Sequence, residues 1–130
     1  MNLKFIANEE KYYEFIRLLR NSNHGDGFVE KVNITPEQQK EYMKIYKECY
    51  YVCLDENIPV GFIGQIDDDI RVAVIPDYFK KGVGKFMVNE LSNKHPTAYA
   101  KVKIENNASL KLFESCGFEK QFYILRKKHD

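Results

Sequence analysis

Apolar residues follow two different spacings along this chain, and each spacing predicts one kind of element. Short runs rich in β-branched and aromatic residues are typical of strands, whereas apolar positions that recur every three or four residues are typical of helices. The strands expected from this pattern cover residues 3–7, 49–54, 58–66, 72–75, 98–104 and 122–125. The expected helices cover about 9–21, 36–46, 82–93 and 107–116. This order of elements indicates one domain, residues 1–130, of mixed α/β type.

Polar residues and glycines mark the ends of these helices. Asn8 is expected to cap the first helix. Thr35 is expected to cap the second, with Pro36 at its first position and Gln38 completing a capping box. Gly117 in a left-handed conformation would end the last helix. The side chains expected to face the core from the second helix are Tyr42, Ile45 and Tyr46.

Turn residues predict how the strands pair. The polar turn at 55–57 joins two adjacent strands, which predicts an antiparallel hairpin. Gly61 and Gly64 inside the second of these strands indicate a bulge or a close backbone neighbour. Three adjacent aspartates, residues 67–69, connect this strand to the next, as a solvated acidic turn would.

The stretch from Val72 to Leu91 predicts a strand, a basic loop and a helix. Pro76 cannot donate to a sheet and ends the strand, while two glycines let the loop bend. The first N–H groups of the helix have no acceptor within it, so the helix dipole and nearby lysines favour an anion there. The glycines are Gly82 and Gly84, and the lysines are Lys80, Lys81 and Lys85. This arrangement predicts a phosphate-binding loop.

The loop fits the well-known phosphate-binding patterns poorly. A Walker A loop would need Gly in place of Phe79 and Ser or Thr in place of Phe86. A dinucleotide fingerprint would need Gly in place of Met87. An ordinary strand–turn–helix, in which the glycines only make the turn, therefore stays open at this point.

Composition narrows the class of protein. With 130 residues and a net charge of +1, the chain does not have the basic excess of a general nucleic-acid binder. It contains no apolar run long enough to span a membrane and no signal-peptide core at its start, so we expect a cytoplasmic protein. Its three cysteines, Cys49, Cys53 and Cys116, lack metal-site spacing and favour buried free thiols over zinc.

Two separated motifs resemble those of the GNAT acetyltransferase superfamily, which transfers acyl groups from acyl-coenzyme A to amines. The family's cofactor motif, Gln/Arg-x-x-Gly-x-Gly/Ala after a strand and a proline, corresponds to residues 79–84. Its second motif, Asn-x-x-Ala/Ser-x-x-x-Tyr-x-x-x-Gly-Phe, corresponds to residues 106–118. The resemblance implies a mixed, mostly antiparallel twisted sheet, splayed at its middle and flanked by about four helices.

The resemblance also implies a binding site for acetyl-CoA, with no metal. The pantetheine arm would pair with the backbone of one strand, and the pyrophosphate would lie on the loop and helix start. The residues implied in cofactor binding are Val72, Ala73, Val74, Phe79, Lys80, Lys81, Gly82, Val83, Gly84, Lys85, Asn106, Ser109 and Phe113. A Cβ at Gly84 is expected to intrude on the pyrophosphate or on the tight turn. Phe79 stands where the family has Gln or Arg, and Lys80 where Gly is common.

The implied reaction is direct attack of a neutral amine on the thioester, with a backbone N–H near Val74 stabilising the oxyanion. Asp69 and Asp68 are the candidate bases, although both would also suit a turn. Phe113 stands where many members have a Tyr that protonates the leaving thiolate, and Phe cannot donate a proton. The leaving thiolate therefore lacks an obvious proton donor.

Three functions stay open on the sequence. The first is an N-acetyltransferase, monomeric or homodimeric, for a small-molecule amine such as an amino sugar, with no nucleic-acid or membrane partner. The second is an acyl-CoA-binding regulatory module with weak or no activity, since Phe113 lacks the hydroxyl. The third is a binder of another phosphate ligand.

Overall fold

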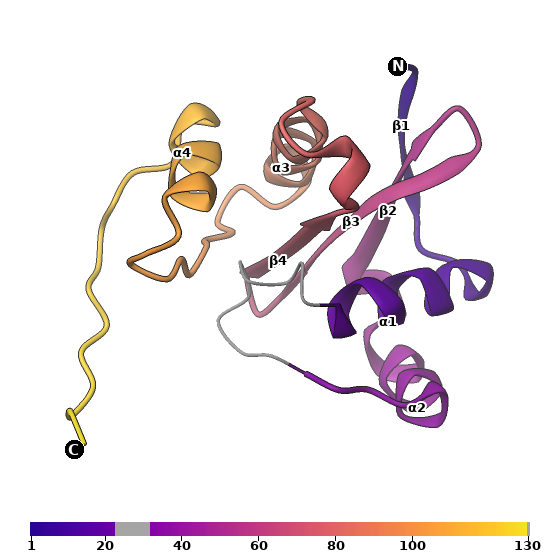
Figure 1. Ribbon diagram of the computed structural model, residues 1–130, viewed down its shortest axis with the longest axis horizontal. Coiled ribbons are helices and arrows are strands. Elements are labelled where there is room, and N and C mark those ends of the chain that lie inside the picture. The colour runs from indigo at the N-terminus through magenta and orange to yellow at the C-terminus, as the bar shows by residue number, and fades with distance from the viewer. Residues whose placement is uncertain (23–31, 130) are drawn as a thin grey trace.

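The chain folds around a four-stranded antiparallel sheet, as the computed structural model describes for residues 1–22 and 32–129 (Figure 1). The spatial order of the strands, β1-β2-β3-β4, is also their order in the chain, and each neighbouring pair is antiparallel. The strands are β1 Leu3–Ala7, β2 Tyr50–Asp55, β3 Ile58–Ile66 and β4 Asp69–Val74. The first three match the predicted strands to within one residue, and β4 begins three residues earlier than predicted.

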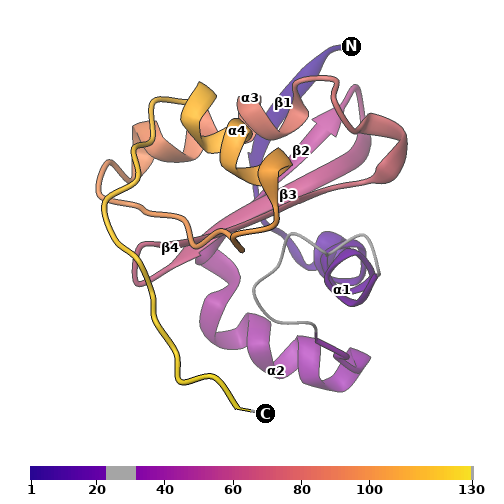
Figure 2. The same ribbon diagram turned by 60° about the vertical axis from the view of Figure 1, so that its left-hand side comes forward.

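Helices cover both faces of the sheet (Figures 1 and 2). One face carries α1 Tyr13–Asn21 and α2 Pro36–Tyr46. The other carries α3 Val83–Lys94, with α4 Asn107–Ser115 packed beside α3. The described residues also include the short 3-10 turns η1 Glu10–Tyr12, η3 Lys47–Cys49 and η4 Pro76–Tyr78. All four predicted helices and the mixed α/β class are confirmed.

Alternate residues of the strands separate into two apolar clusters, one on each face of the sheet. The α3 face buries Cys53, Ile63 and Ile70 against Met87 and Leu91. The α1–α2 face buries Val52, Leu54 and Phe62 against Ile16 and Met43. Because burying one such side chain stabilises the fold by about 1.5–3 kcal/mol, the sheet is fixed from both sides.

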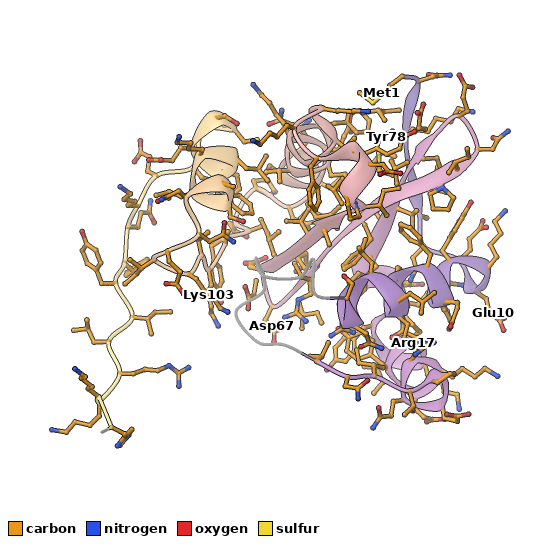
Figure 3. All side chains as sticks on the ribbon, viewed as in Figure 1. Met1, Glu10, Arg17, Asp67, Tyr78 and Lys103 are labelled. Carbon is orange, nitrogen blue, oxygen red and sulfur yellow. The ribbon has the colours of Figure 1, made fainter. Side chains whose placement is uncertain are left out.

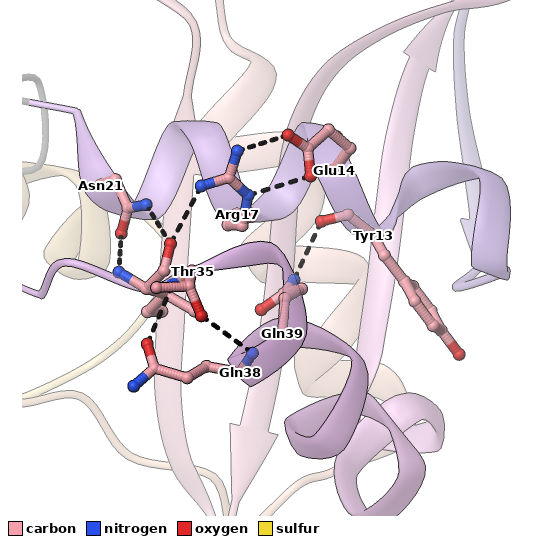
Figure 4. Close-up of polar contacts among 8 residues, drawn as sticks. Tyr13, Glu14, Arg17, Asn21, Thr35, Gln38 and Gln39 are labelled. Carbon is pink, nitrogen blue, oxygen red and sulfur yellow. Dashed lines mark hydrogen bonds and ion pairs between the residues drawn. The ribbon is translucent and has the colours of Figure 1, made fainter.

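Polar contacts join α1 to the start of α2 (Figure 4). The Ile34 carbonyl accepts hydrogen bonds from Arg17 Nη1 at 2.9 Å and Asn21 Nδ2 at 2.8 Å. The Asn21 side-chain oxygen accepts from the Ile34 N–H at 2.8 Å. Buried Gln39 donates to the Tyr13 carbonyl at 2.9 Å. The predicted capping box of Thr35 is present, so the entry into α2 is defined by its own sequence.

Two predicted strands are absent from the described part of the chain. Within 98–104, Tyr99 makes one isolated parallel bridge to Asp69, and Ile104 is 93% exposed. Residues 122–125 form no strand either, and Phe122 is 88% exposed. Both segments have strand-like sequences, but a strand needs a run of paired residues, and of the described residues in these segments only Tyr99 bridges to the sheet.

Two predictions about individual side chains are also wrong. Asn8 does not cap a helix: it is 4% exposed, and its amide donates to the Lys47 carbonyl at 3.2 Å. Asn8 thereby ties the end of β1 to η3. Ile45 is 73% exposed, because Gln39 and Met43 take the fully buried positions of α2.

The glycines in β3 behave as predicted. The register of β2 against β3 shifts between Cys53 and Leu54, opposite Gly61, which marks a bulge. A Cβ on Gly61 would lie 2.8 Å from the Met87 methyl group, and one on Gly64 would lie 2.6 Å from the Tyr50 ring. Both positions therefore exclude a side chain.

Candidate functional site

The start of α3 presents backbone donors without acceptors. Gly82 is the N-cap, with φ of 87°, and no side chain caps the helix. The first helical hydrogen bond runs from the Phe86 N–H to the Gly82 carbonyl, at 3.0 Å. The N–H groups of residues 80–85 form no well-aligned hydrogen bond with another described residue, although residues 79–82 form turns. A Cβ on Gly82 would meet no other atom within 4 Å.

Lysine side chains surround this helix start. Lys80, Lys81 and Lys85 are exposed, and none forms an ion pair with a described carboxylate. The Lys81 ammonium lies 5.3 Å from the centre of the Tyr78 ring. The Tyr78 hydroxyl donates to Asp55 at 2.7 Å and lowers the pKa of that carboxyl, so Asp55 stays charged at neutral pH. Tyr78 lies above the end of the sheet in Figure 3.

The outer edge of β4 is open beyond its first two residues. The Ile70 N–H donates outward to the Tyr99 carbonyl at 2.9 Å, whereas the Ile75 N–H donates inward to Val60 of β3 at 2.9 Å. Because backbone groups alternate along a strand, the N–H groups of Val72 and Val74 point outward. That of Ala73 points toward β3. The segment that follows α3 thus pairs with β4 at Tyr99 and then diverges from it, which matches the predicted splay of the sheet.

Gly84 has a close neighbour that the sequence analysis did not predict. It lies in the first turn of α3, and a Cβ there would approach the Leu112 side chain of α4 to 3.2 Å. The neighbour is therefore a helix, rather than the loop backbone. Gly84 allows α3 and α4 to pack closely, whereas Lys80 (φ 61°) and Gly82 (φ 87°) supply the left-handed positions of the turn before α3.

The second motif forms α4 and its two ends. The Asn106 side-chain oxygen accepts from the Ser109 N–H at 3.1 Å, which caps the helix. Phe113 is 6% exposed in the apolar cluster of the α3 face, and its ring centre lies 5.2 Å from that of Phe118. Bonds from Phe118 to Phe113 and from Gly117 to Glu114, both 3.0 Å, make a Schellman motif, which confirms the predicted helix end.

The three aspartates form the turn between β3 and β4. Asp67 and Asp68 have positive φ of 52° and 70°, as in a two-residue hairpin turn (Asp67 is labelled in Figure 3). Asp68 accepts from the Thr97 hydroxyl at 2.9 Å, and its carbonyl accepts from the Tyr99 N–H at 2.8 Å. Asp68 therefore holds the chain that follows α3 against the turn.

Asp69 lies at the first position of β4, among cationic groups. Its Oδ2 is 3.5 Å from the Lys101 ammonium and 3.8 Å from the Arg71 guanidinium. The side chain of Asp69 remains 22% exposed. The two candidate bases differ in their contacts. The Asp68 carboxylate accepts a hydrogen bond from Thr97, whereas the Asp69 carboxylate contacts Lys101 and Arg71.

A group of polar side chains that the sequence analysis did not find lies on the α1–α2 face. We call Arg20, Tyr42, Tyr50 and Arg71 the tyrosine–arginine cluster. The two tyrosine hydroxyls are 2.6 Å apart, Arg71 donates to Tyr42 at 3.3 Å, and the Arg20 guanidinium lies 4.7 Å from the Tyr42 ring centre. Tyr50 is 1% exposed, and burial raises the pKa of its hydroxyl, so the phenol stays neutral.

One sequence signal does lead to this cluster. Tyr50, Gly64 and Arg71 lie side by side across three strands, and the Tyr50 ring occupies the space above Gly64. The sequence predicts a close neighbour at Gly64. A large side chain on the adjacent strand, such as Tyr50, is the kind of neighbour that a glycine in a strand accommodates.

The described residues contain no group of three His, Cys, Asp or Glu side chains that could hold a metal ion. The helices in the same ranges are too short or too polar to cross a membrane.

Comparison with solved structures identifies N-acetyltransferases of the same fold. A spermidine N-acetyltransferase from Vibrio cholerae, solved with CoA and spermine, has a TM-score of 0.80 at 18% identity, over 97% of this chain and 86% of that one. An aminoglycoside N-acetyltransferase solved with CoA has a TM-score of 0.74 at 12% identity, over 98% and 95%. An N-acetyltransferase from Staphylococcus aureus Mu50 has a TM-score of 0.75 at 15% identity, over 92% and 84%.

No curated protein sequence matches this chain significantly. A family model described as an acetyltransferase (GNAT) domain matches residues 46–120, which is more than half of the chain. The matched range runs from the end of α2 through α4, and it contains the open edge of β4 and the start of α3. The chain therefore belongs to the GNAT acetyltransferase family.

Proposed function

We propose that this protein is an N-acetyltransferase that moves an acetyl group from acetyl-CoA to the primary amine of a small molecule. The observation that carries the proposal is the run of N–H groups at residues 80–85 that form no well-aligned hydrogen bond with another described residue, beside the open edge of β4. Family membership supports it, because GNAT neighbours were solved with CoA.

The residues at the start of α3 fit a pyrophosphate. Its oxygens need several donors and positive charge, and the helix start supplies both. The left-handed Gly82 turns the chain into α3, and nothing lies within 4 Å of a Cβ built there. Lys80, Lys81 and Lys85 would add attraction from the sides, and Val83 would contribute its backbone N–H. Phe79, Asn106 and Ser109 stay predicted contacts.

The edge of β4 suits the pantetheine arm. Val72 and Val74 point their backbone groups outward, and they would pair with the arm's amides. Ala73, whose N–H faces β3, would contribute van der Waals contact. The Val74 N–H would then stabilise negative charge on the acetyl oxygen during the reaction.

The proposed transfer is direct. The neutral amine attacks the acetyl carbonyl, a C–N bond forms, the C–S bond breaks, and the sulfur leaves as a thiol after taking up a proton. A lysine-like amine has a pKa of about 10.4, so a base must first remove a proton from it. We assign this role to Asp69, whose carboxylate is partly exposed at the start of β4. Asp68 is the second candidate.

One observation favours a second candidate function, an acyl-CoA-binding module with little activity. Phe113 has no hydroxyl to protonate the leaving sulfur and is 6% exposed in the core. We still favour an enzyme, because a thiol with a pKa of about 8.5 is a good leaving group without such help.

A screen of amines with detection of released thiol separates the two functions. Calorimetry with CoA should first show binding, and the screen should then show thiol release above the rate with no amine. Binding without release from any amine would support the module. Absence of CoA binding would overturn both functions and leave a binder of another phosphate ligand.

A further inference from the structure

The tyrosine–arginine cluster lies on the same face of β4 as the proposed base. Side chains two residues apart on a strand project from one face. Asp69 and Arg71 are two apart, and their side chains approach to 3.8 Å. An acceptor amine that gives its proton to Asp69 would therefore lie within reach of the Arg71 guanidinium.

The charge around this position is positive. Among the described residues, the charged groups that face Asp69 and the cluster are Arg20, Arg71, Lys101 and the Asp69 carboxylate itself. Three cations therefore contact Asp69 or the cluster, while the neighbouring Asp68 carboxylate accepts a hydrogen bond from Thr97. Tyr42 and Tyr50 add neutral hydroxyl groups. Such a site repels a second ammonium group on an acceptor and attracts an acidic group.

The two arginines have donors to spare. Arginine has five N–H donors, and Arg71 directs donors to the hydroxyls of Tyr42 and Tyr50, which leaves others for a ligand. The Asp69 oxygen, at 3.8 Å from Arg71, is too far for a hydrogen bond. The Arg71 side chain is 30% exposed, so a ligand can reach it. Arg20 Nη1 is buried and has no acceptor within the described part of the chain.

We propose that the acceptor is an amino carboxylate, an amino acid or a similar compound, whose carboxylate binds Arg71 while its amine lies beside Asp69. This inference rests on the proposed function. The planar guanidinium matches a carboxylate through two parallel hydrogen bonds, which fixes the orientation as well as the charge of the ligand. Tyr42 holds Arg71 from one side, and Arg20 stacked on Tyr42 holds that ring in turn.

Matched acceptors test the inference. Each amino acid is compared with its amide, which keeps the side chain and the amine but lacks the carboxylate, and rates are corrected for the fraction of neutral amine. We expect kcat/KM for the free acid to exceed that for the amide and for spermidine at least tenfold. Equal values for acid and amide, or a preference for spermidine, would overturn the inference.

Substitution of Arg71 tests the contact itself. Arg71→Gln should raise KM for the free acid at least tenfold and leave KM for the amide within twofold. Arg71→Lys should give an intermediate KM, because it keeps the charge but loses the paired hydrogen bonds. Arg126→Gln, in the exposed tail, is the control for a lost arginine. An equal rise in KM for acid and amide would overturn the inference, because Arg71 would then not recognise the carboxylate.

Binding measurements keep this test separate from that of the proposed function. If no amine is acetylated, the proposed function fails, and calorimetry of the CoA-bound protein with the free acids and amides still probes the site. Binding of acids that is lost in folded Arg71→Gln, with no binding of amides, would support the carboxylate site. Absence of binding by any acid would overturn it.

Discussion

The two faces of the sheet offer polar groups in opposite ways. On the α3 face, the candidate cofactor site consists of backbone N–H groups around Gly82 and exposed lysines. On the α1–α2 face, the tyrosine–arginine cluster consists of side chains packed against one another. A backbone site persists under most substitutions that keep the chain path, whereas a side-chain site is lost with one residue. Substitutions should therefore separate cofactor binding from acceptor chemistry.

The largest effect is expected at the proposed base. Asp69→Asn removes the proton acceptor and should lower turnover by about 10²–10⁴-fold. Affinity for acetyl-CoA should stay unchanged, because the donors at the start of α3 are untouched. Steady-state kinetics and calorimetry measure the two quantities.

Asp67→Asn is the matched control for Asp69→Asn, because Asn also tolerates the left-handed conformation of that turn position. It should leave turnover as it is. Wild-type turnover in Asp69→Asn would contradict the assignment and make Asp68 the next residue to test.

Next in size is the contact between α3 and α4. Gly84→Val should lower the free energy of unfolding by about 1–3 kcal/mol, because its side chain overfills the space against Leu112. Urea unfolding measures the loss. Gly84→Ala should cost less, since better helix propensity offsets the contact. A loss that persists in a Leu112→Ala background would disprove the steric explanation.

At the turn before α3, Gly82→Val should weaken CoA binding more than tenfold, or by over ~1.4 kcal/mol. Valine disfavours positive φ, so the loop would shift and its N–H groups would no longer converge. Calorimetry of the folded variant checks this. Unchanged affinity would remove Gly82 from the cofactor site.

The smallest effect is expected from one lysine beside the backbone donors. Lys81→Gln should weaken CoA binding about two- to fivefold, in line with about 0.3–1 kcal/mol for a charge near a helix end. The difference from wild type should shrink as salt is added. Lys40→Gln, on the opposite side of the sheet, should have no effect. A loss above tenfold would mean that side chains, rather than the backbone, dominate this face.

Local sequence rules predicted most of the fold. Thr35, Pro36 and Gln38 define the start of α2 through contacts within four residues, and Gly117 defines the end of α4 in the same way. Segment 98–104 has an equally clear strand pattern, yet it forms a single bridge. Strand formation there depends on a partner elsewhere in the chain, which periodicity does not report.

In the candidate site too, the parts formed by neighbouring residues were predicted from the sequence, and the contacts between distant residues were not. The loop at 79–84 was recognised because one contiguous motif forms it. The contact between Arg71 and Tyr42 joins residues 29 positions apart, and no spacing rule links them. Ile45 illustrates the same limit, because helical periodicity alone did not reveal that Met43 takes the buried position.

The Schellman motif at Gly117 directs the chain away from α4 and exposes a four-residue apolar run from Phe122 to Leu125. Such a run with high β-propensity can pair with copies of itself on other molecules. Lys120 precedes it, and three basic residues, 126–128, follow it, so like charges would oppose that pairing. Because salt screens these charges, self-association of the protein should increase with ionic strength and should be least in dilute buffer.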